Sequence, residues 1–166
     1  MLVQLAHAKG ARVIALASSQ DKRSAALAAG ASDAVDSGEG WVECVRALAA
    51  DGVDVVYDSI GRTLGDSLAL ARIGGTVVFY GMAAGDPDAV DPRLLMDRSL
   101  TLVGGDLWNV LTSAQARQRR ADRLFAALRD GRLKVTIAAR FALRDGAQAH
   151  ALLESRGSAG KVLLIP

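Results

Sequence analysis

Small hydroxyl groups and cations stand together near the start of the chain, in the stretch "IALASSQDKRSAALAAG". A β-branched apolar run ends at Ser18 and Ser19, and Lys22 and Arg23 follow within one helical turn. Hydroxyls donate hydrogen bonds to phosphate oxygens, and a lysine ammonium adds a positive point charge. These residue types at this spacing therefore indicate a binding site for an anion.

Apolar segments of strand length alternate with helical periodicity along the chain. We expect strands over residues 12–17, 33–35, 53–57, 76–80, 100–103, 137–141 and 161–165. We expect helices over residues 2–9, 22–29, 41–48, 63–72, 113–130 and 145–155, with a short helix or turn in "DPRLLMD". Continuous apolar strands between helices predict an α/β fold, a Rossmann-like doubly wound parallel sheet covered on both faces.

Three loops with small residues follow strands of this predicted sheet. They are "SSQDK", "DSIG" and "YGMAAG". Ligands of doubly wound sheets bind outside the carboxyl ends of the strands. We therefore expect these loops to form the binding site.

The glycine-rich turn that normally opens a dinucleotide fold is not in this sequence, which contains no G-x-G-x-x-G. The opening "MLVQLAHAKGARVIAL" is typical of the second half of the first helix followed by the second strand. We therefore expect a piece of a longer protein that lacks the first strand and the glycine-rich loop. The alternative is a smaller sheet with its own N-terminal helix.

Composition narrows the function classes. The 166 residues are 51% hydrophobic with a net charge of +2, which indicates a folded domain and argues against a nucleic-acid partner. One cysteine, Cys44, and two histidines leave no basis for a disulfide or a zinc site. The sequence shows neither a signal segment nor an apolar run of about 20 residues, so we expect a cytoplasmic protein and no membrane partner.

The chain resembles the C-terminal half of quinone oxidoreductases, the zinc-free branch of the medium-chain dehydrogenase/reductase superfamily. The strings that carry the resemblance span the whole chain: "QLAHAKGARVIAL", "ALAAGASDAVD", "GVDVVYDSIG", "GGTVVFYG", "SLTLVGGDLW" and "LLESRGSAGKVLLIP". The resemblance implies an NADPH-dependent reductase of quinones or related α,β-unsaturated carbonyls. It also implies two parts: residues 1–131 as an incomplete NADP-binding Rossmann domain, and residues 132–166 as a strand–helix–strand that returns to an absent N-terminal catalytic domain.

The first loop favours NADPH over NADH. An NAD-preferring protein usually carries Asp or Glu at the end of the second strand, where the carboxylate binds the ribose and repels a 2′-phosphate. Here the strand ends in serines, and by resemblance Lys22 matches the lysine that binds the 2′-phosphate. Asp21 could instead bind a ribose, but we expect it to cap the helix. An NADH site, and a plain strand–turn–helix without cofactor, stay open as alternatives.

The resemblance assigns further residues to the cofactor. Ser37 occupies the position of a tyrosine that often flanks the phosphate in the family. The other positions matched to the cofactor's riboses, nicotinamide or phosphates are Ser59, Gly61, Tyr80, Gly81, Met82 and Arg156. In hydride transfer the cofactor carries the chemistry, and we assign no catalytic residue and no metal ligand in this chain.

Three expectations concern partners and competing functions. The expected strand 100–103, which begins at Leu100 and ends at Val103, matches a strand that pairs with its copy in relatives, so we expect a homodimer. A second reading of the sequence is an enoyl-thioester reductase domain. A third is a truncated, non-catalytic chain that retains the dimer-forming strand.

Overall fold

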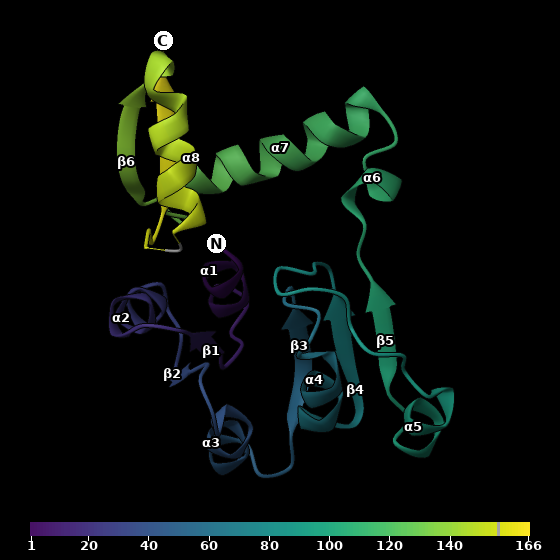
Figure 1. Ribbon diagram of the computed structural model, residues 1–166. Coiled ribbons are helices and arrows are strands. Elements are labelled where there is room, and N and C mark those ends of the chain that lie inside the picture. The colour runs from purple at the N-terminus through teal and green to yellow at the C-terminus, as the bar shows by residue number, and fades with distance from the viewer. Residues whose placement is uncertain (156) are drawn as a thin grey trace. The chain divides into compact units, whose positions relative to one another are not determined.

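The computed structural model describes residues 1–155 and 157–166, and these form two compact units (Figure 1). Unit 1 contains Met1–Gly38 and Gln118–Pro166. Unit 2 contains Glu39–Arg117. Among the described residues the strands form three parallel sheets, with the orders β1-β2, β3-β4-β5 and β6-β7.

The first sheet of unit 1 aligns the ends of two strands. Helix α1 (Leu2–His7) precedes β1 (Ile14–Ala17), and helix α2 (Gln20–Ala28) connects β1 to β2 (Asp33–Asp36). The two strands pair in parallel from Ile14 opposite Asp33 to Ala17 opposite Asp36. The loops that follow both strands therefore emerge side by side at one edge of the sheet.

The second sheet of unit 1 is a compact strand–helix–strand. Helix α7 (Ala114–Arg129) leads to β6 (Ile137–Ala142), a 3₁₀ turn η1 (Leu143–Asp145), helix α8 (Gly146–Glu154) and β7 (Lys161–Ile165). Strands β6 and β7 pair in parallel, and α8 lies against both (Figure 1). The side chain of Gln4 donates to the carbonyl of Lys134 and accepts from its N–H, which ties α1 to the segment before β6.

Unit 2 is built around the three-stranded sheet. Helix α3 (Trp41–Leu48) precedes β3 (Val53–Asp58), α4 (Leu64–Leu70), β4 (Ala71–Phe79), α5 (Pro92–Asp97), β5 (Thr101–Gly104) and α6 (Leu107–Val110). Helix α4 covers β3 and β4 (Figure 1). The apolar side chains between helix and sheet form the core: Leu64, Leu68, Ala71, Val77 and Leu100.

An arginine ties the end of α4 to the turn before β5. The Arg98 guanidinium donates to the carbonyl of Leu68 at 2.8 Å and also to the carbonyl of Ala71. The last carbonyls of a helix have no partner within the helix and carry partial negative charge, so a cation there stabilises it.

The expected α/β class with parallel sheets is confirmed, and most expected elements appear within a few residues of their predicted bounds. One boundary was wrong: β4 begins at Ala71, not at residue 76. Val53 pairs with Ala71 and Val55 with Thr76, so an irregularity containing Gly74 and Gly75 lies inside the strand. In the sequence these two glycines indicate the start of a strand, but in the structure they lie inside β4 and accommodate the register shift. The short helix α6 was not expected.

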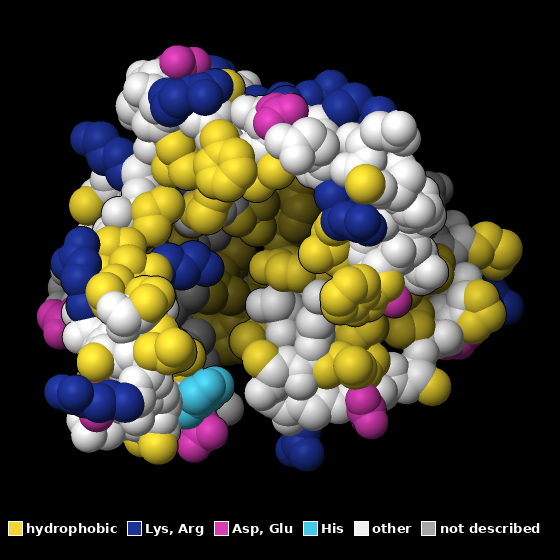
Figure 2. Space-filling view, turned by 90° about the horizontal axis from the view of Figure 1, so that it is seen from above, with side chains coloured by type: hydrophobic (Ala, Val, Ile, Leu, Met, Phe, Trp, Pro, Cys, Tyr) yellow, Lys and Arg dark blue, Asp and Glu magenta, His cyan; other side chains and the backbone are white. Residues whose placement is uncertain are grey.

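Large apolar side chains are exposed in the two segments that follow β4 and β5. Trp108 is 83% exposed, and Leu107 and Met82 are also open to solvent. In Figure 2, hydrophobic side chains reach the surface over much of the face shown. Exposed apolar surface of this kind marks sites for ligands or other protein surfaces. Within the described residues, no helix combines the length and apolar character that a membrane crossing needs.

Candidate functional site

Four of the predicted residues stand at the carboxyl edge of the β1–β2 sheet. We call Ser18, Ser19, Lys22 and Ser37 the phosphate cluster. The first three follow β1, and Ser37 follows β2. The N–H of Ser37 donates to the carbonyl of Ala17 at 3.2 Å, which holds the second loop against the end of the first strand. The structure thus brings these four residues to one edge.

The helix after β1 is capped by Ser19. Its backbone is extended, and its Oγ accepts from the N–H of Lys22 at 3.4 Å. The expectation that Asp21 caps this helix was wrong, because α2 begins at Gln20 and Asp21 lies in its first turn. A side chain inside the first turn cannot reach the N–H three residues ahead as an N-cap does, although its charge suits this end of the helix.

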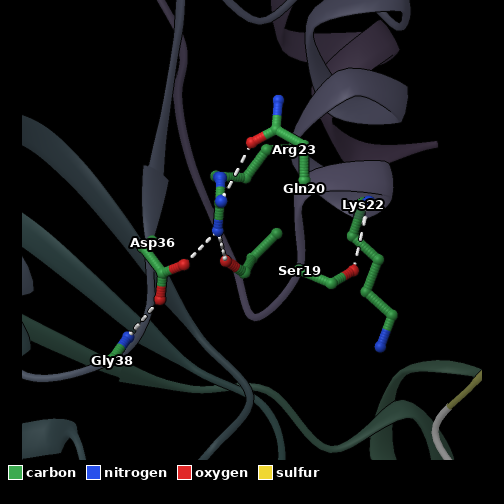
Figure 3. A network of polar contacts seen from close by, with 7 residues as sticks. Ser19, Gln20, Lys22, Arg23, Asp36 and Gly38 are labelled. Carbon is green, nitrogen blue, oxygen red and sulfur yellow. Dashed lines mark hydrogen bonds and ion pairs between the residues drawn. The ribbon is translucent and has the colours of Figure 1, made fainter.

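An ion-pair network that the sequence analysis missed lies beside the phosphate cluster (Figure 3). The Arg23 guanidinium donates to Asp36 and to Gln20 Oε1, the latter at 3.0 Å, and lies 3.5 Å from the carbonyl of Ala17. The other carboxylate oxygen of Asp36 accepts from the N–H of Gly38 at 2.8 Å. In Figure 3 the Lys22 side chain extends away from this pair. The sequence did contain a signal for this network, because Asp36 stands at the end of β2 and parallel pairing places that end beside α2.

In unit 2, two loops at the carboxyl edge of the sheet are joined by backbone hydrogen bonds. We call residues 58–61 and 80–85 the interlocked loops. The N–H groups of Ala83 and Ala84 donate to the carbonyls of Ser59 and Ile60 at 3.0 and 2.9 Å. These bonds bring together the predicted residues Ser59, Gly61, Tyr80, Gly81 and Met82.

Glycine is required where these loops touch. Gly61 is buried and has φ +89°, and a Cβ on it would stand 2.1 Å from the carbonyl oxygen of Gly85. At Gly81 a Cβ would stand 3.1 Å from the carbonyl oxygen of Ser59. A side chain at Gly61 would push the loops apart, whereas one at Gly81 would need the neighbouring backbone to give by a few tenths of an ångström.

Asp58 organises the first of the interlocked loops from inside. Its side chain is buried, and its oxygens accept from the N–H groups of Ile60 and Gly61 and from the hydroxyls of Thr63 and Ser67, over 2.7–3.1 Å. Burial alone would raise the pKa of Asp58, but the four donors outweigh it and hold the pKa below the ordinary 3.8. At neutral pH Asp58 is therefore an ionised turn former, not an acid catalyst.

The tyrosine and methionine of this edge are open to solvent. Tyr80 is 47% and Met82 57% exposed, and the Tyr80 ring packs edge-on against Tyr57. A shallow hollow beside Tyr80 is lined by Gly105, Asp106, Leu107 and Val110. The sequence analysis had placed neither Leu107 nor Val110 at the cofactor site. Asp106 caps α6 by accepting from the N–H of Trp108 at 3.0 Å.

Arg156, expected near the cofactor phosphates, lies outside the described residues. In the described part of the chain, no three His, Cys, Asp or Glu side chains gather as metal ligands.

Residues 1–124 match the protein-family model described as "Zinc-binding dehydrogenase". Although that name refers to zinc, the described residues provide no ligand set for the metal.

Named relatives and a solved structure agree with the resemblance to quinone oxidoreductases. A probable quinone oxidoreductase of Schizosaccharomyces pombe is 35% identical over 99% of this chain and 50% of its own length. A 2-haloacrylate reductase of a Burkholderia species is 34% identical over 100% of this chain and 51% of its own. The structure of Escherichia coli quinone oxidoreductase complexed with NADPH superposes with a TM-score of 0.88, at 32% identity, over 99% of this chain and 52% of that one.

These matches confirm the resemblance and the Rossmann-like fold. The chain spans about half the length of the relatives it matches.

The Asp58 hydrogen bonds make a prediction about stability. Asp58→Asn removes the charge while preserving the shape, and we expect the free energy of unfolding at pH 7 to fall by about 1–3 kcal/mol. Because the folded-state pKa is depressed, the wild-type advantage is complete above pH 3.8 and shrinks as the pH falls through the lower folded value. Urea denaturation followed by circular dichroism checks both statements. A deficit that does not change with pH would mean that folding does not lower the pKa of Asp58.

The Gly61 contact makes a second prediction. Gly61→Ala forces a left-handed backbone on alanine, which costs about 1–3 kcal/mol, and adds the clash with Gly85. We expect lower thermal stability and shifted amide resonances for residues 82–85. The control is Gly65→Ala, inside α4 with open space around it, which we expect to be neutral or stabilising. Equal effects of the two substitutions would refute the close packing of the loops.

Proposed function

The chain belongs to the zinc-binding dehydrogenase family, and we propose that it is the NADPH-binding half of a reductase that transfers hydride to a quinone or a related α,β-unsaturated carbonyl. The observation that carries the proposal is the phosphate cluster, in which two serines directly follow β1 where an NAD-preferring protein usually has an acid, and a lysine stands in the first turn of α2. The match to a quinone oxidoreductase solved with NADPH supports the choice of cofactor.

The phosphate cluster has the donors that a 2′-phosphate needs. The Ser19 oxygen accepts from the Lys22 N–H, so its own O–H proton remains available to donate. The Ser18 hydroxyl is exposed and the Lys22 ammonium supplies positive charge, and the N-terminal end of α2 adds partial positive charge. We assign the 2′-phosphate to these groups, with Ser37 beside them.

The interlocked loops suit the approach of a ribose. Gly81 has no side chain to hold a ligand away from the backbone, and Asp58 and Gly61 fix the loop shape without occupying its surface. By resemblance, we assign Ser59 and Gly61 to the adenosine side and Tyr80, Gly81 and Met82 to the nicotinamide ribose. Arg156 stays a predicted phosphate ligand.

Bound NADPH would supply the hydride, and the described residues would bind and orient it. We name no catalytic residue among them. The relative named for reduction of a 2-haloacrylate favours a conjugated double bond as the substrate class. The division at residue 131, with 132–166 returning to another domain, and the cytoplasmic location stay predictions.

Charge reversal at Lys22 tests the cofactor assignment. Lys22→Glu replaces an attraction for the 2′-phosphate with a repulsion, and we expect NADPH to bind at least about tenfold more weakly while NADH changes by less than about threefold. Titration of each cofactor into the chain, followed by amide NMR shifts, measures both affinities. Lys9→Glu, an equal charge change at an exposed site after α1, is the control and should alter neither. Equal losses for NADPH and NADH would contradict the phosphate assignment.

We also propose that β5 mediates a homodimer. It pairs with β4 on one side and stands at the end of the order β3-β4-β5, so its other edge offers backbone donors and acceptors to a second copy.

A charge on β5 tests the dimer. Val103 is 40% exposed, and Val103→Lys should convert dimer to monomer because a lysine at an edge opposes strand pairing. Light scattering after gel filtration measures the mass, and circular dichroism confirms the fold. Met96→Lys, at a 67% exposed site in α5, should leave the dimer intact. Wild-type protein that is monomeric at high micromolar concentration would rule this interface out.

A further inference from the structure

A carboxylate stands at the same edge as the phosphate cluster, although none ends β1. Asp36 is the last residue of β2, lies opposite Ala17 and directly precedes Ser37. Its side chain is 58% exposed. An ionised acid this close to a dianionic phosphate would oppose binding, as the acid of NAD-preferring sites does. The edge therefore needs a neighbouring cation that offsets Asp36.

Arg23 is that cation. Its guanidinium forms an ion pair with Asp36, and only 20% of its side chain is exposed. Gln20 and the carbonyl of Ala17 also accept from it, so the guanidinium is held in place by acceptors from α2, β1 and β2 (Figure 3). An arginine fixed in this way cancels a carboxylate charge more effectively than a mobile surface pair.

We propose that Arg23 determines cofactor specificity indirectly, by neutralising Asp36 so that the edge accepts a 2′-phosphate. This inference rests on the proposed NADPH function. Arg23 acts through Asp36 as a positioning residue and is not itself the phosphate ligand, because its guanidinium faces Asp36 and Gln20. Lys22 extends in the other direction, so the two neighbouring cations have different tasks.

The test compares two ligands that differ only in the 2′-phosphate: adenosine 2′,5′-bisphosphate and 5′-AMP. Both are titrated into the chain and followed by amide NMR shifts. The preference is the ratio of the 5′-AMP dissociation constant to that of the bisphosphate. Four variants are compared with wild type: Arg23→Gln, Arg23→Lys, Asp36→Asn and the double variant Arg23→Gln/Asp36→Asn.

We expect Arg23→Gln to reduce the preference about tenfold, since it leaves one uncompensated charge beside the phosphate. Arg23→Lys keeps the charge and should keep most of the preference. Asp36→Asn should preserve or increase it. The double variant should return to within about threefold of wild type, because the repelling carboxylate is gone.

Each other result overturns a defined statement. A double variant as weak as Arg23→Gln would show that Arg23 contacts the phosphate directly. Equal losses for both ligands in Arg23→Gln would show a purely structural role. If Arg23→Gln does not fold, Asp36→Asn decides the question. Loss of its preference for the bisphosphate over 5′-AMP overturns the inference, and an unchanged or increased preference supports it. Wild-type protein with no preference for the bisphosphate would refute the proposed NADPH site itself, and with it the inference.

Discussion

Parallel pairing of β1 with β2 determines which charges meet in unit 1. Because Ala17 lies opposite Asp36, the loop after each strand emerges at the same edge, although about twenty residues separate them in sequence. The serines and Lys22 come from one loop, and Asp36 and Ser37 come from the other. An edge assembled this way holds both hydroxyl and lysine donors and a carboxylate, and under the proposed function its preference for a 2′-phosphate would depend on how Arg23 compensates Asp36.

Unit 2 uses the same strand arrangement for a different purpose. Its sheet brings together the loops after β3 and β4, and the contact between them depends on shape more than on charge. Gly61 and Gly85 meet backbone to backbone, and Asp58 satisfies two N–H groups and two hydroxyls beneath them. Ionised Asp58 costs desolvation free energy, which the four donors offset. The result is a fixed backbone surface with no side chain of its own at Gly81.

The sequence predicted the order of elements well because strand and helix periodicities are local. It also predicted that loops would gather at the carboxyl ends of parallel strands, and within each unit they do: the loops after β1 and β2 in unit 1, and the loops after β3 and β4 in unit 2. That the loops of the two units share one rim stays a prediction. Its errors have physical reasons. The Asp21 cap failed because the helix begins one residue after Ser19, a shift that periodicity cannot resolve. The Gly74–Gly75 irregularity was taken as a strand boundary because glycines mark both. The Arg23–Asp36 pair was missed because it joins residues thirteen apart, and only the register of β1 with β2 shows that they meet.

The central claim is that the edge of the β1–β2 sheet recognises a ribose 2′-phosphate. Mapping amide shifts of the wild-type chain on addition of adenosine 2′-monophosphate, with adenosine as reference, tests it most directly. The account predicts that the shifts specific to the phosphate concentrate at Ser18, Ser19, Lys22 and Ser37. Phosphate-specific shifts confined to other elements, or a map identical to that of adenosine, would contradict it.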